Sequence, residues 1–381
     1  MKKLILKISE YKLVFISVAF LVIFSVGCVK KEENGIKIGA ILTLTGDTAK
    51  YGENVKKGIE LALQETNASG GIKGKILKVL YEDSKADPKV AVSAFQKLVT
   101  IDKVQIILGP MSSSEVLAVS PLAEKMKIII FTPTASAPSI TNAGDYIFRN
   151  VTSDVFEGEA LALFTFNDLK LKKVAIIYIN NDYGIGLRDS FKNKFENLGG
   201  KIIEMESFEQ SSTDMKSQIS KIKAAKPEAV FIVGYIEMGI ILKQASELGL
   251  KTQFLSCNMF EDPEILRIAG GISNGVYYTY RLFETKSTEK IVNNFVEKYK
   301  LIYRSEPDIF SALGYDAMKI LGHAMEKEGF TAGEVKQAIY SIQNLPTVTG
   351  SISFDNNGDV LQSMGIKVVK DGRFIWYKRI R

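Results

Sequence analysis

The chain of 381 residues is poor in the side chains that most often bind metals or act as nucleophiles. It contains two cysteines, Cys28 and Cys257, and a single histidine, His323. A zinc site or a Cys/His nucleophile pair needs several such residues at short spacing. The sequence therefore predicts no metal site, and we expect Cys257 to be a buried structural thiol.

Nucleotide-binding motifs are also missing. The first apolar run is not followed by the G-x-G-x-x-G spacing that a dinucleotide requires, and Gly109-Pro110 does not lead into the Gly-Lys-Ser/Thr of a P-loop. No basic stripe interleaved with aromatic residues occurs, and the formal charge of +6 falls to +3 without the four lysines and one glutamate of residues 1–27. We expect no cofactor, no nucleic-acid partner and no enzymatic activity.

Proline is scarce, with nine residues, and no segment is of low complexity. Hydrophobic residues make up 46% of the chain and charged residues 24%, which is typical of a globular protein. A chain of this length exceeds a single hydrophobic core. The composition thus predicts two domains and little disorder.

The first 28 residues read as a targeting segment. Four lysines precede an apolar stretch at Leu13–Val26, and Gly27-Cys28 follows as a small-residue cleavage point. This resembles a bacterial lipoprotein signal peptide, which implies that Cys28 becomes a lipidated N-terminus, although Ser25 stands where that pattern prefers Leu. An uncleaved membrane anchor is the alternative. Either way we expect an extracytoplasmic protein held at the outer face of the cell membrane, on the periplasmic side if an outer membrane exists, with residues 29–35 as a tether.

One pattern occurs twice in the rest of the chain. The apolar run Ile36–Leu42 leads to Tyr51-Gly52, and the run Val174–Ile179 leads to Tyr183-Gly184. In parallel α/β sheets ligands gather at the carboxyl ends of the strands, so two such lobes facing one another would enclose a ligand. The repeat indicates a clamshell binding protein.

Strands and helices alternate up to about residue 280. The predicted strands are short runs that read as apolar on both faces, which favours parallel strands covered by helices: Ile36–Leu42, Ile76–Tyr81, Val104–Leu108, Ile128–Phe131, Val174–Ile179, Ile202–Phe208, Ala229–Val233, Gln253–Leu255 and Val276–Tyr280. Long helices follow at Thr288–Tyr303, Ile309–Lys327 and Thr331–Ile342, and then strands at Ser351–Phe354, Met364–Val369 and Phe374–Lys378, with a hairpin loop at residues 355–358.

Details within the first two helices are predicted as well. Val55, Ile59, Ala62, Leu63 and Thr66 fall on one helical face, which predicts that they share the core-facing stripe. Asp87-Pro88 reads as an N-cap followed by proline at the first helical position.

The predicted fold class is α/β, with two doubly wound parallel-sheet lobes joined by a three-crossover hinge. We expect crossings near residues 151–154, 280–284 and 355–362. Residues 36–152 with 283–357 then form the N-terminal lobe, and residues 153–282 with 358–381 form the C-terminal lobe.

An ordered set of short motifs carries a family resemblance. The markers are Thr45-Gly46 with Tyr51-Gly52, residues 67–74 (NASGGIKG), Gly109-Pro110 with Ser112–Ser114, residues 132–136 (TPTAS), and residues 249–254 (GLKTQF). In this order they resemble the leucine/isoleucine/valine-binding proteins of branched-chain amino-acid ABC importers, which have the type I periplasmic-binding fold. The resemblance covers essentially all of residues 36–381.

The resemblance implies a set of ligand-binding residues. In the family a serine hydroxyl and backbone N–H groups hold the ligand carboxylate, which corresponds here to Ser112 and to the loop of Ser136; a helix that begins near Ser113 would add the positive end of its dipole. Simple N-capping by one of the three serines is the alternative. A carbonyl at Thr134 would face a ligand ammonium, and aromatic side chains would surround the ligand. The implied set is Tyr51, Ser112, Thr134, Ala135, Ser136, Tyr183, Tyr235, Asn258 and Phe310.

Asn258 departs from the family pattern, which usually has an acidic residue there to pair with the ligand ammonium. A buried ammonium without a carboxylate loses a charge-assisted hydrogen bond. Either the ligand is not a simple α-amino acid, or Glu261, Asp262 or Glu237 supplies the charge.

The expected function is that of a solute-binding lipoprotein of an ABC importer. It would capture a branched-chain or other hydrophobic amino acid by lobe closure and deliver it to a membrane permease, and we expect a monomer. The alternatives are a binding protein for an amide, urea or a small aliphatic or aromatic carboxylate, and a ligand-sensing receptor of a signalling system.

Overall fold

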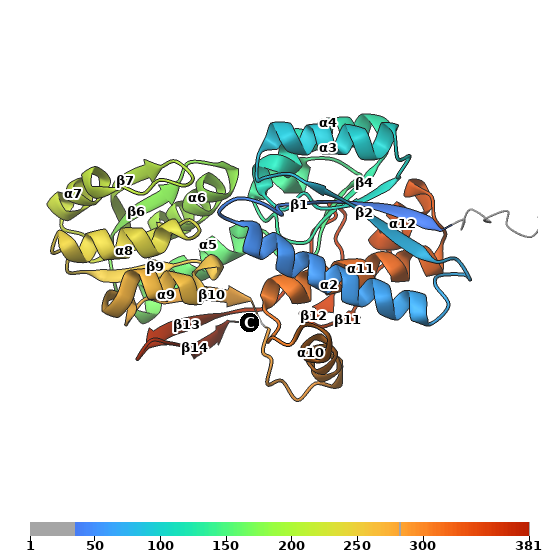
Figure 1. Ribbon diagram of the computed structural model, residues 1–381. Helices are drawn as coiled ribbons and strands as arrows, with labels where there is room; N and C mark the ends of the chain where they lie inside the picture. The colour runs from blue at the N-terminus through green and yellow to red at the C-terminus, as the bar shows by residue number, and fades with distance from the viewer. Residues whose placement is uncertain (1–34, 282, 381) are drawn as a thin grey trace, which may run out of the picture.

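The computed structural model describes residues 35–281 and 283–380, which form two α/β lobes side by side (Figure 1). The first lobe is built on a five-stranded parallel sheet in the order β2-β1-β3-β4-β5. Its strands are β1 Ile36–Leu42, β2 Leu77–Asp83, β3 Ile106–Leu108, β4 Ile129–Thr132 and β5 Ile147–Arg149. Its helices are α2 Ala49–Ala68, α3 Pro88–Thr100, α4 Ser113–Met126, α10 Lys290–Tyr303, α11 Ile309–Lys327 and α12 Ala332–Tyr340, with the single turn η1 at Pro138–Asn142.

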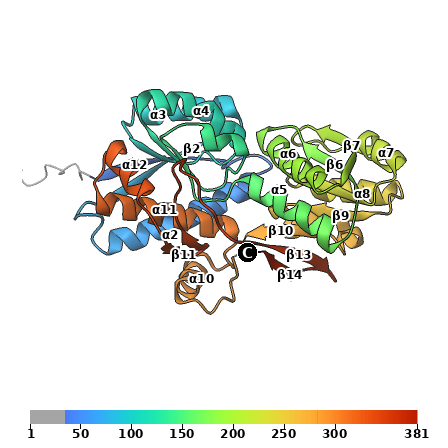
Figure 2. The same ribbon diagram turned by 180° about the vertical axis from the view of Figure 1, so that it is seen from behind.

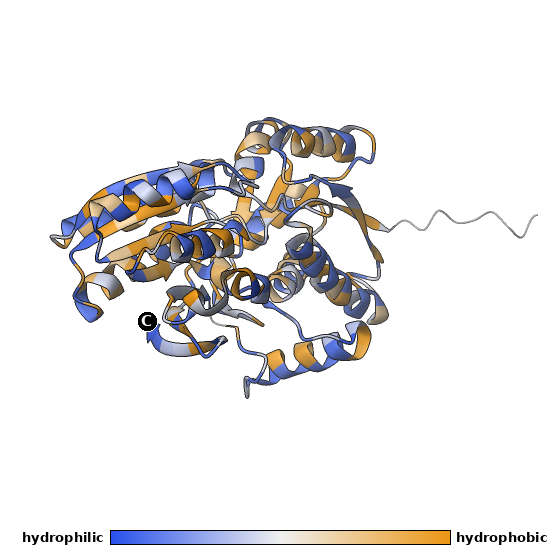
Figure 3. Ribbon diagram, turned by 60° about the vertical axis from the view of Figure 1, so that its left-hand side comes forward, coloured by the Kyte–Doolittle hydropathy of each residue, from blue (hydrophilic) through white to orange (hydrophobic). Residues whose placement is uncertain are grey.

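Alternation along β1 explains why helices cover both faces of this sheet. Ile38, Ala40 and Leu42 belong to a core shared with α2 and α11, whereas Ile41 belongs to a second core shared with α3 and α4. Both sets are fully buried. In Figure 3 the strands are accordingly orange over most of their length, whereas the helices around them mix orange and blue.

The second lobe is built on a seven-stranded sheet in the order β14-β13-β10-β9-β8-β6-β7. Its strands are β6 Lys173–Ile179, β7 Lys201–Phe208, β8 Ala229–Val233, β9 Gln253–Ser256, β10 Tyr277–Arg281, β13 Met364–Lys370 and β14 Arg373–Ile380. Its helical segments are α5 Asp154–Leu163, η2 Phe164–Asp168, α6 Asp182–Asn197, α7 Lys216–Ala225, α8 Glu237–Glu247, η3 Asn258–Phe260, α9 Pro263–Ala269 and η4 Gly270–Ser273. Helices α8 and α9 lie in front of the sheet in Figure 1, and α5 and α6 lie in front of it in the reverse view of Figure 2.

The predicted two-lobed α/β fold is confirmed, with one addition. Strands β13 and β14 extend the second sheet in antiparallel fashion, so this sheet is mixed at one edge. The N-cap prediction at Asp87 is also confirmed, because its carboxylate accepts hydrogen bonds from the N–H groups of Lys89 and Val90.

Other details of the sequence prediction were wrong. Strands β2 and β7 are sheet edges and largely half-exposed, not buried on both faces. In α2, Thr66 is only half-buried and Leu61 lies in the core, whereas Leu63 is partly buried and packs against the core as predicted. Strand β5 and the small hairpin of β11 Leu345–Thr347 with β12 Gly350–Ile352 were missed or misplaced, because runs of three residues carry too little periodicity to be recognised.

Three segments carry the chain between the lobes: from β5 to α5, from β10 to α10, and from β12 to β13. The first and third touch, since the N–H of Gln362 donates to Oγ1 of Thr152 at 2.8 Å. The predicted loop at residues 355–358 is a tight turn flanked by an antiparallel bridge between Phe354 and Val360. The residue limits given above for each lobe stay a prediction.

No helix in the described part of the chain combines the length and apolar character needed to cross a membrane. The predicted signal peptide, the lipidation of Cys28 and most of the tether lie outside the described residues.

Candidate functional site

A cavity lies between the lobes, at the carboxyl ends of strands from both sheets. All nine residues of the predicted ligand-binding set line it, so the structure brings the whole set together; their role in binding stays a prediction. The lining residues of the first lobe are Thr43, Thr48, Tyr51, Ala86, Met111, Ser112, Ser113, Thr134, Ala135, Ser136 and Phe310. Those of the second lobe are Tyr183, Gln210, Tyr235, Asn258, Met259 and Arg281.

The repeated Tyr-Gly pair places one tyrosine on each side of the cavity. A Cβ atom on Gly52 would lie 1.8 Å from the carbonyl oxygen of Thr43, and one on Gly184 would lie 2.0 Å from that of Ile179. In both lobes glycine therefore lets the helix start press against the end of the first strand. The preceding tyrosine is carried to the cavity wall by this close approach.

The two tyrosines then pack differently. Tyr51 lies against Phe310, with ring centroids 4.6 Å apart, whereas Tyr183 stacks on Tyr235 at 5.7 Å with an interplanar angle of 12°. The Tyr183 hydroxyl donates to Sγ of Cys257 at 3.2 Å. Cys257 is the buried thiol that was expected, and burial raises its pKa to about 12.

The amino end of α4 forms one polar wall. Ser112 is its N-cap: Oγ of Ser112 accepts from the N–H of Glu115, and Oε2 of Glu115 accepts from the N–H of Ser112. The hydroxyl of Ser113 accepts from the N–H of Ala137 at 3.1 Å, and the hydroxyl of Thr134 donates to the carbonyl of Met111 at 2.7 Å. The first N–H groups of an α-helix have no intrahelical acceptor, so this rigid wall favours an anion.

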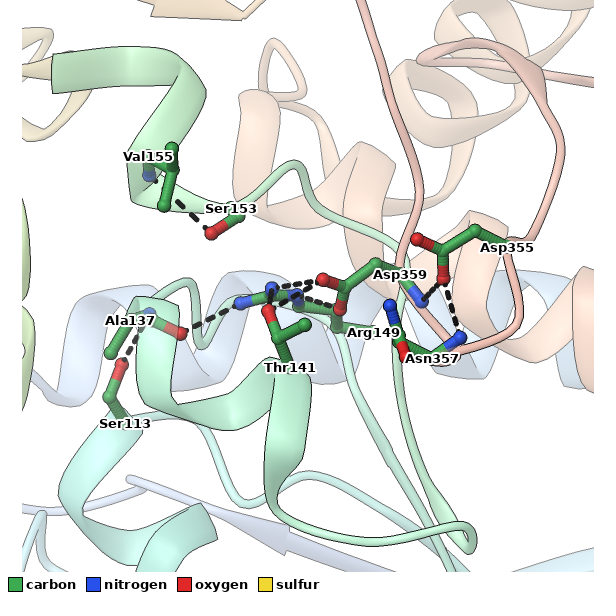
Figure 4. A network of polar contacts seen from close by, with 9 residues as sticks. All are labelled: Ser113, Ala137, Thr141, Arg149, Ser153, Val155, Asp355, Asn357 and Asp359. Atoms are coloured by element: carbon green, nitrogen blue, oxygen red, sulfur yellow. Dashed lines mark hydrogen bonds and ion pairs between the residues drawn. The ribbon is translucent and has the colours of Figure 1, made fainter. Parts of the chain in front are cut away.

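A buried arginine connects this wall to the third crossing segment (Figure 4). Arg149 is fully buried; its Nε and Nη2 donate to the two carboxylate oxygens of Asp359, each at 2.6 Å, and its Nη1 donates to the carbonyl of Ala137 at 2.9 Å. Since the N–H of Ala137 donates to Ser113, a continuous chain of hydrogen bonds runs from the crossing segment to the cavity wall.

The lobes also touch directly beside the cavity. The Tyr51 hydroxyl and Nζ of Lys50 each donate to the Asp262 carboxylate at 2.9 Å. The Ser114 hydroxyl donates to Asp182 at 2.5 Å, and the Ser211 hydroxyl donates to Asp47 at 2.6 Å. The structure therefore shows the two lobes closed on one another.

A buried cluster of polar groups lies behind Asn258. Both the backbone N–H and the side-chain amide of Asn258 donate to Glu157, at 2.8 and 2.5 Å, and Oδ1 of Asn258 accepts from Nη1 of Arg281 at 3.1 Å. Glu157 also accepts from the Thr279 hydroxyl at 2.5 Å. Asp154, one turn before Glu157 on α5, is fully buried; burial and the charge of Glu157 raise its pKa to about 7, although Arg281 and the Ser136 hydroxyl act in the opposite direction.

None of the three acidic residues offered as substitutes for Asn258 lines the cavity. Glu237 accepts from the backbone N–H groups of Ser211 and Tyr235. Glu261 pairs with Lys367 and the Tyr278 hydroxyl, and Asp262 is bonded to the opposite lobe as described. The described residues that line the cavity thus include one ionisable cation, Arg281, and no carboxylate.

Sequence reasoning missed Arg281, Ser113 and Gln210 as lining residues. A signal for Arg281 was present, because a charged residue directly follows the apolar run Val276–Tyr280 at the sheet edge where ligands gather. Ser113 was considered only as the start of a helix whose dipole would favour an anion and as a possible N-cap, not as a lining side chain. Gln210 follows strand β7 in a loop without a distinguishing pattern.

Comparison with known proteins supports this description. A family model described as "Periplasmic binding protein" matches residues 35–373. The leucine-, isoleucine-, valine-, threonine- and alanine-binding protein of Pseudomonas aeruginosa is 30% identical over 328 residues, which are 85% of this chain and 87% of that protein.

Two solved structures extend the comparison. The leucine-binding protein LivK of Thermotoga maritima is 30% identical, with a TM-score of 0.84, over 91% of this chain and 98% of the other. A solute-binding protein of an ABC transporter from Rhodopseudomonas palustris BisB5, in complex with 3,4-dihydroxybenzoic acid, is 25% identical, with a TM-score of 0.82, over 91% and 98%.

Proposed function

The chain belongs to the leucine/isoleucine/valine-binding protein family of type I periplasmic binding proteins, and we propose that it captures a small carboxylate-bearing solute by lobe closure and delivers it to a membrane permease. Members of this family are extracytoplasmic solute-binding proteins of ABC importers. A branched-chain or other hydrophobic amino acid is the solute class that the names of the relatives indicate.

One observation carries the proposal: the cavity between the lobes joins a wall of hydrogen-bond donors to apolar walls. The amino end of α4 and the hydroxyls of Ser113 and Ser136 supply donors on one wall. Tyr51, Phe310 and the stacked pair Tyr183 and Tyr235 supply the apolar walls. A solute with a carboxylate at one end and an apolar body would use both.

Thermal unfolding with candidate solutes tests this proposal. Protein without residues 1–28 should melt at a higher temperature with its solute, since a ligand at 100 times its Kd adds about 2.7 kcal/mol to the free energy of unfolding. The screen should contain amino acids, amides, urea and small aliphatic and aromatic acids. The proposal fails if no carboxylate-bearing compound in the screen raises the melting temperature.

A small acid without an ammonium group is a second candidate solute. Asn258 in place of the acidic residue expected there, with Arg281 beside it, favours this candidate. The dihydroxybenzoate complex of the Rhodopseudomonas protein shows that a protein with this fold holds such an acid.

We also propose that lipid on Cys28 holds the protein at the membrane, with residues 29–35 as tether. Cys28→Ser removes the thiol that acylation needs, so the protein should leave the membrane fraction or remain unprocessed. A processed Cys28→Ser protein that still sediments with membranes would argue against lipidation. The monomeric state and the division into residues 36–152 with 283–357 and residues 153–282 with 358–381 belong to the same proposal; small-angle scattering should show a monomer that becomes more compact with solute.

A further inference from the structure

Arg281 combines deep burial with incomplete hydrogen bonding. Arg281 is the last residue of strand β10, and its side chain lines the cavity although the residue is only 7% exposed. Nη1 donates to Asn258, whereas Nε has no partner among the described residues. A buried guanidinium with an unused donor needs an acceptor, because leaving it unpaired costs free energy.

The carboxylates around Arg281 lie behind it and not in the cavity. Glu157 is 1% exposed and its oxygens already accept from Asn258 and Thr279. Asp154 is fully buried and absent from the cavity wall, and neither of its carboxylate oxygens has a hydrogen-bond partner among the described residues. A solute at this wall therefore meets the guanidinium and the Asn258 amide directly, whereas neither carboxylate lines the cavity.

Arg281 also lies near the wall that would hold the carboxylate. Asp154 is held next to Ser136, since its backbone N–H donates to the Ser136 carbonyl at 2.9 Å, and Arg281 is close enough to Asp154 to favour its charged form. An ammonium on the carbon beside the carboxylate would thus approach a guanidinium in a poorly solvated space. Like charges repel strongly under these conditions.

From this juxtaposition we propose that Arg281 is a ligand-binding residue that sets the solute class: it donates to an oxygen of the solute, so the site selects a small carboxylic acid without an ammonium group over the α-amino acid with the same side chain. The inference rests on the proposed function and narrows it. Asn258 supports the selection by orienting Arg281 and by leaving no carboxylate at that position.

Matched solute pairs test the inference on the protein without residues 1–28. Titration calorimetry compares leucine with 4-methyl-2-oxopentanoate, and phenylalanine with phenylpyruvate, so that each pair shares a side chain. In the wild-type protein we expect each oxo acid to bind at least tenfold more tightly than its amino acid. Benzoate and 4-methylpentanoate show whether the carboxylate alone is sufficient.

Arg281→Met keeps an unbranched apolar stem and removes the guanidinium with its charge. We expect it to weaken oxo-acid binding by about 10- to 100-fold, as for the loss of a hydrogen bond to a charged group. The ratio of affinities within each solute pair should therefore shift in favour of the amino acid. Asn258→Asp places a carboxylate against both Arg281 and Glu157. Where this variant folds, it should shift the affinity ratios in the same direction without removing the arginine. Arg188→Met is the control, because Arg188 pairs with its neighbour Asp189 away from the cavity.

The outcomes separate the two claims. If amino acids bind as tightly as their oxo acids to the wild-type protein, or more tightly, the inference about Arg281 is wrong while the carboxylate-binding function stands. If the oxo acids bind more tightly but both folded variants leave the ratio within threefold, Arg281 does not set the solute class and the inference is also wrong. A wild-type preference for the oxo acids that a folded variant reduces supports the inference. If none of the acids binds, the proposed function fails and the inference fails with it.

Discussion

The two lobes contribute walls of different chemistry to one cavity. The first lobe offers hydroxyl and backbone groups that its own hydrogen bonds hold in place, such as Ser112 as N-cap and Thr134 bonded to Met111. The second lobe offers stacked tyrosines and a guanidinium in front of a buried acidic cluster. We infer that the first wall recognises the carboxylate common to many solutes and that the second wall selects what is attached to it.

Despite this difference in chemistry, the two lobes share one structural feature. In each lobe the first strand is followed by a turn and a Tyr-Gly pair, and a Cβ atom placed on that glycine would lie about 2 Å from the carbonyl oxygen at the end of the strand. The sheets diverge only afterwards, with five parallel strands in one lobe and a mixed seven-stranded sheet in the other. The shared geometry thus lies at the strand ends that border the cavity. The difference lies at the edge of the second sheet, where strands β13 and β14 are added.

The largest expected effect contrasts the buried ion pair between the first lobe and the third crossing segment with a surface ion pair of the second lobe. Arg149→Met removes the charged donor of the Asp359 carboxylate, which keeps the Thr141 hydroxyl, and the donor of the Ala137 carbonyl, so the free energy of unfolding should fall by about 3–5 kcal/mol. Arg188→Met breaks the partly exposed pair with Asp189 and should change it by about 0–1 kcal/mol. Urea unfolding of both variants measures the two changes in the free energy of unfolding. Equal losses would contradict the prediction that the buried Arg149 network contributes more than the surface pair.

The next effect tests whether the two Tyr-Gly pairs are equivalent. Gly52→Ala and Gly184→Ala each force a methyl group against a backbone carbonyl, and each should lower the free energy of unfolding by about 3 kcal/mol, at the upper end for overpacking. Gly333→Ala is the matched control, since a Cβ there meets nothing within 4 Å on helix α12; it should be neutral or stabilise by about 0.4–1 kcal/mol. If only one of the two glycines is sensitive, the lobes are less alike than their turns indicate.

A smaller effect addresses the contact between the lobes. Tyr51→Phe removes the hydrogen bond to Asp262 across the cleft, which should weaken solute binding about tenfold, because a bond to a charged group stabilises only the closed form. Tyr303→Phe removes a hydroxyl that donates to the Lys57 carbonyl within the first lobe and should leave affinity unchanged. Calorimetric titration of both variants decides; equal affinities would mean that closure does not depend on Asp262.

The smallest expected effect is a pH dependence of folding stability, which arises at Asp154 where the chain enters the second lobe. The pKa of Asp154 is raised in the folded protein to about 7, so the folded state binds a proton that the unfolded chain has released, and stability falls as pH rises. Between pH 6 and 8 this should lower the free energy of unfolding by about 1 kcal/mol.

Asp154→Asn should flatten that slope. Asp316 in the first lobe, with its pKa raised to about 6, should contribute in the same direction but mainly at lower pH. Unfolding measured at several pH values in the solute-free protein checks both statements, and an unchanged slope in Asp154→Asn would refute the assignment to Asp154.

Much of the fold was predictable because long, strongly periodic runs dominate it. Strand Ile36–Leu42, strand Ala229–Val233 and helix Ile309–Lys327 begin and end where the sequence predicted. Strand β5 was missed because three residues show no periodicity, and the half-exposed faces of β2 and β7 were misjudged because apolarity does not tell an edge strand from a central one.

By itself the sequence determined the two repeats and the glycines at the turns, because these depend on local patterns at the carboxyl ends of strands. The nine predicted residues that meet at the cavity followed from the family resemblance. Tertiary structure alone decided how the charges are used. Asp262 accepts a hydrogen bond from the opposite lobe, and Glu157 accepts hydrogen bonds from Asn258. Arg281, in contrast, lines the cavity. The partner of a buried ionisable group comes from residues that are distant in the chain. No local spacing in the sequence therefore tells which of several acidic residues will be buried next to a given arginine.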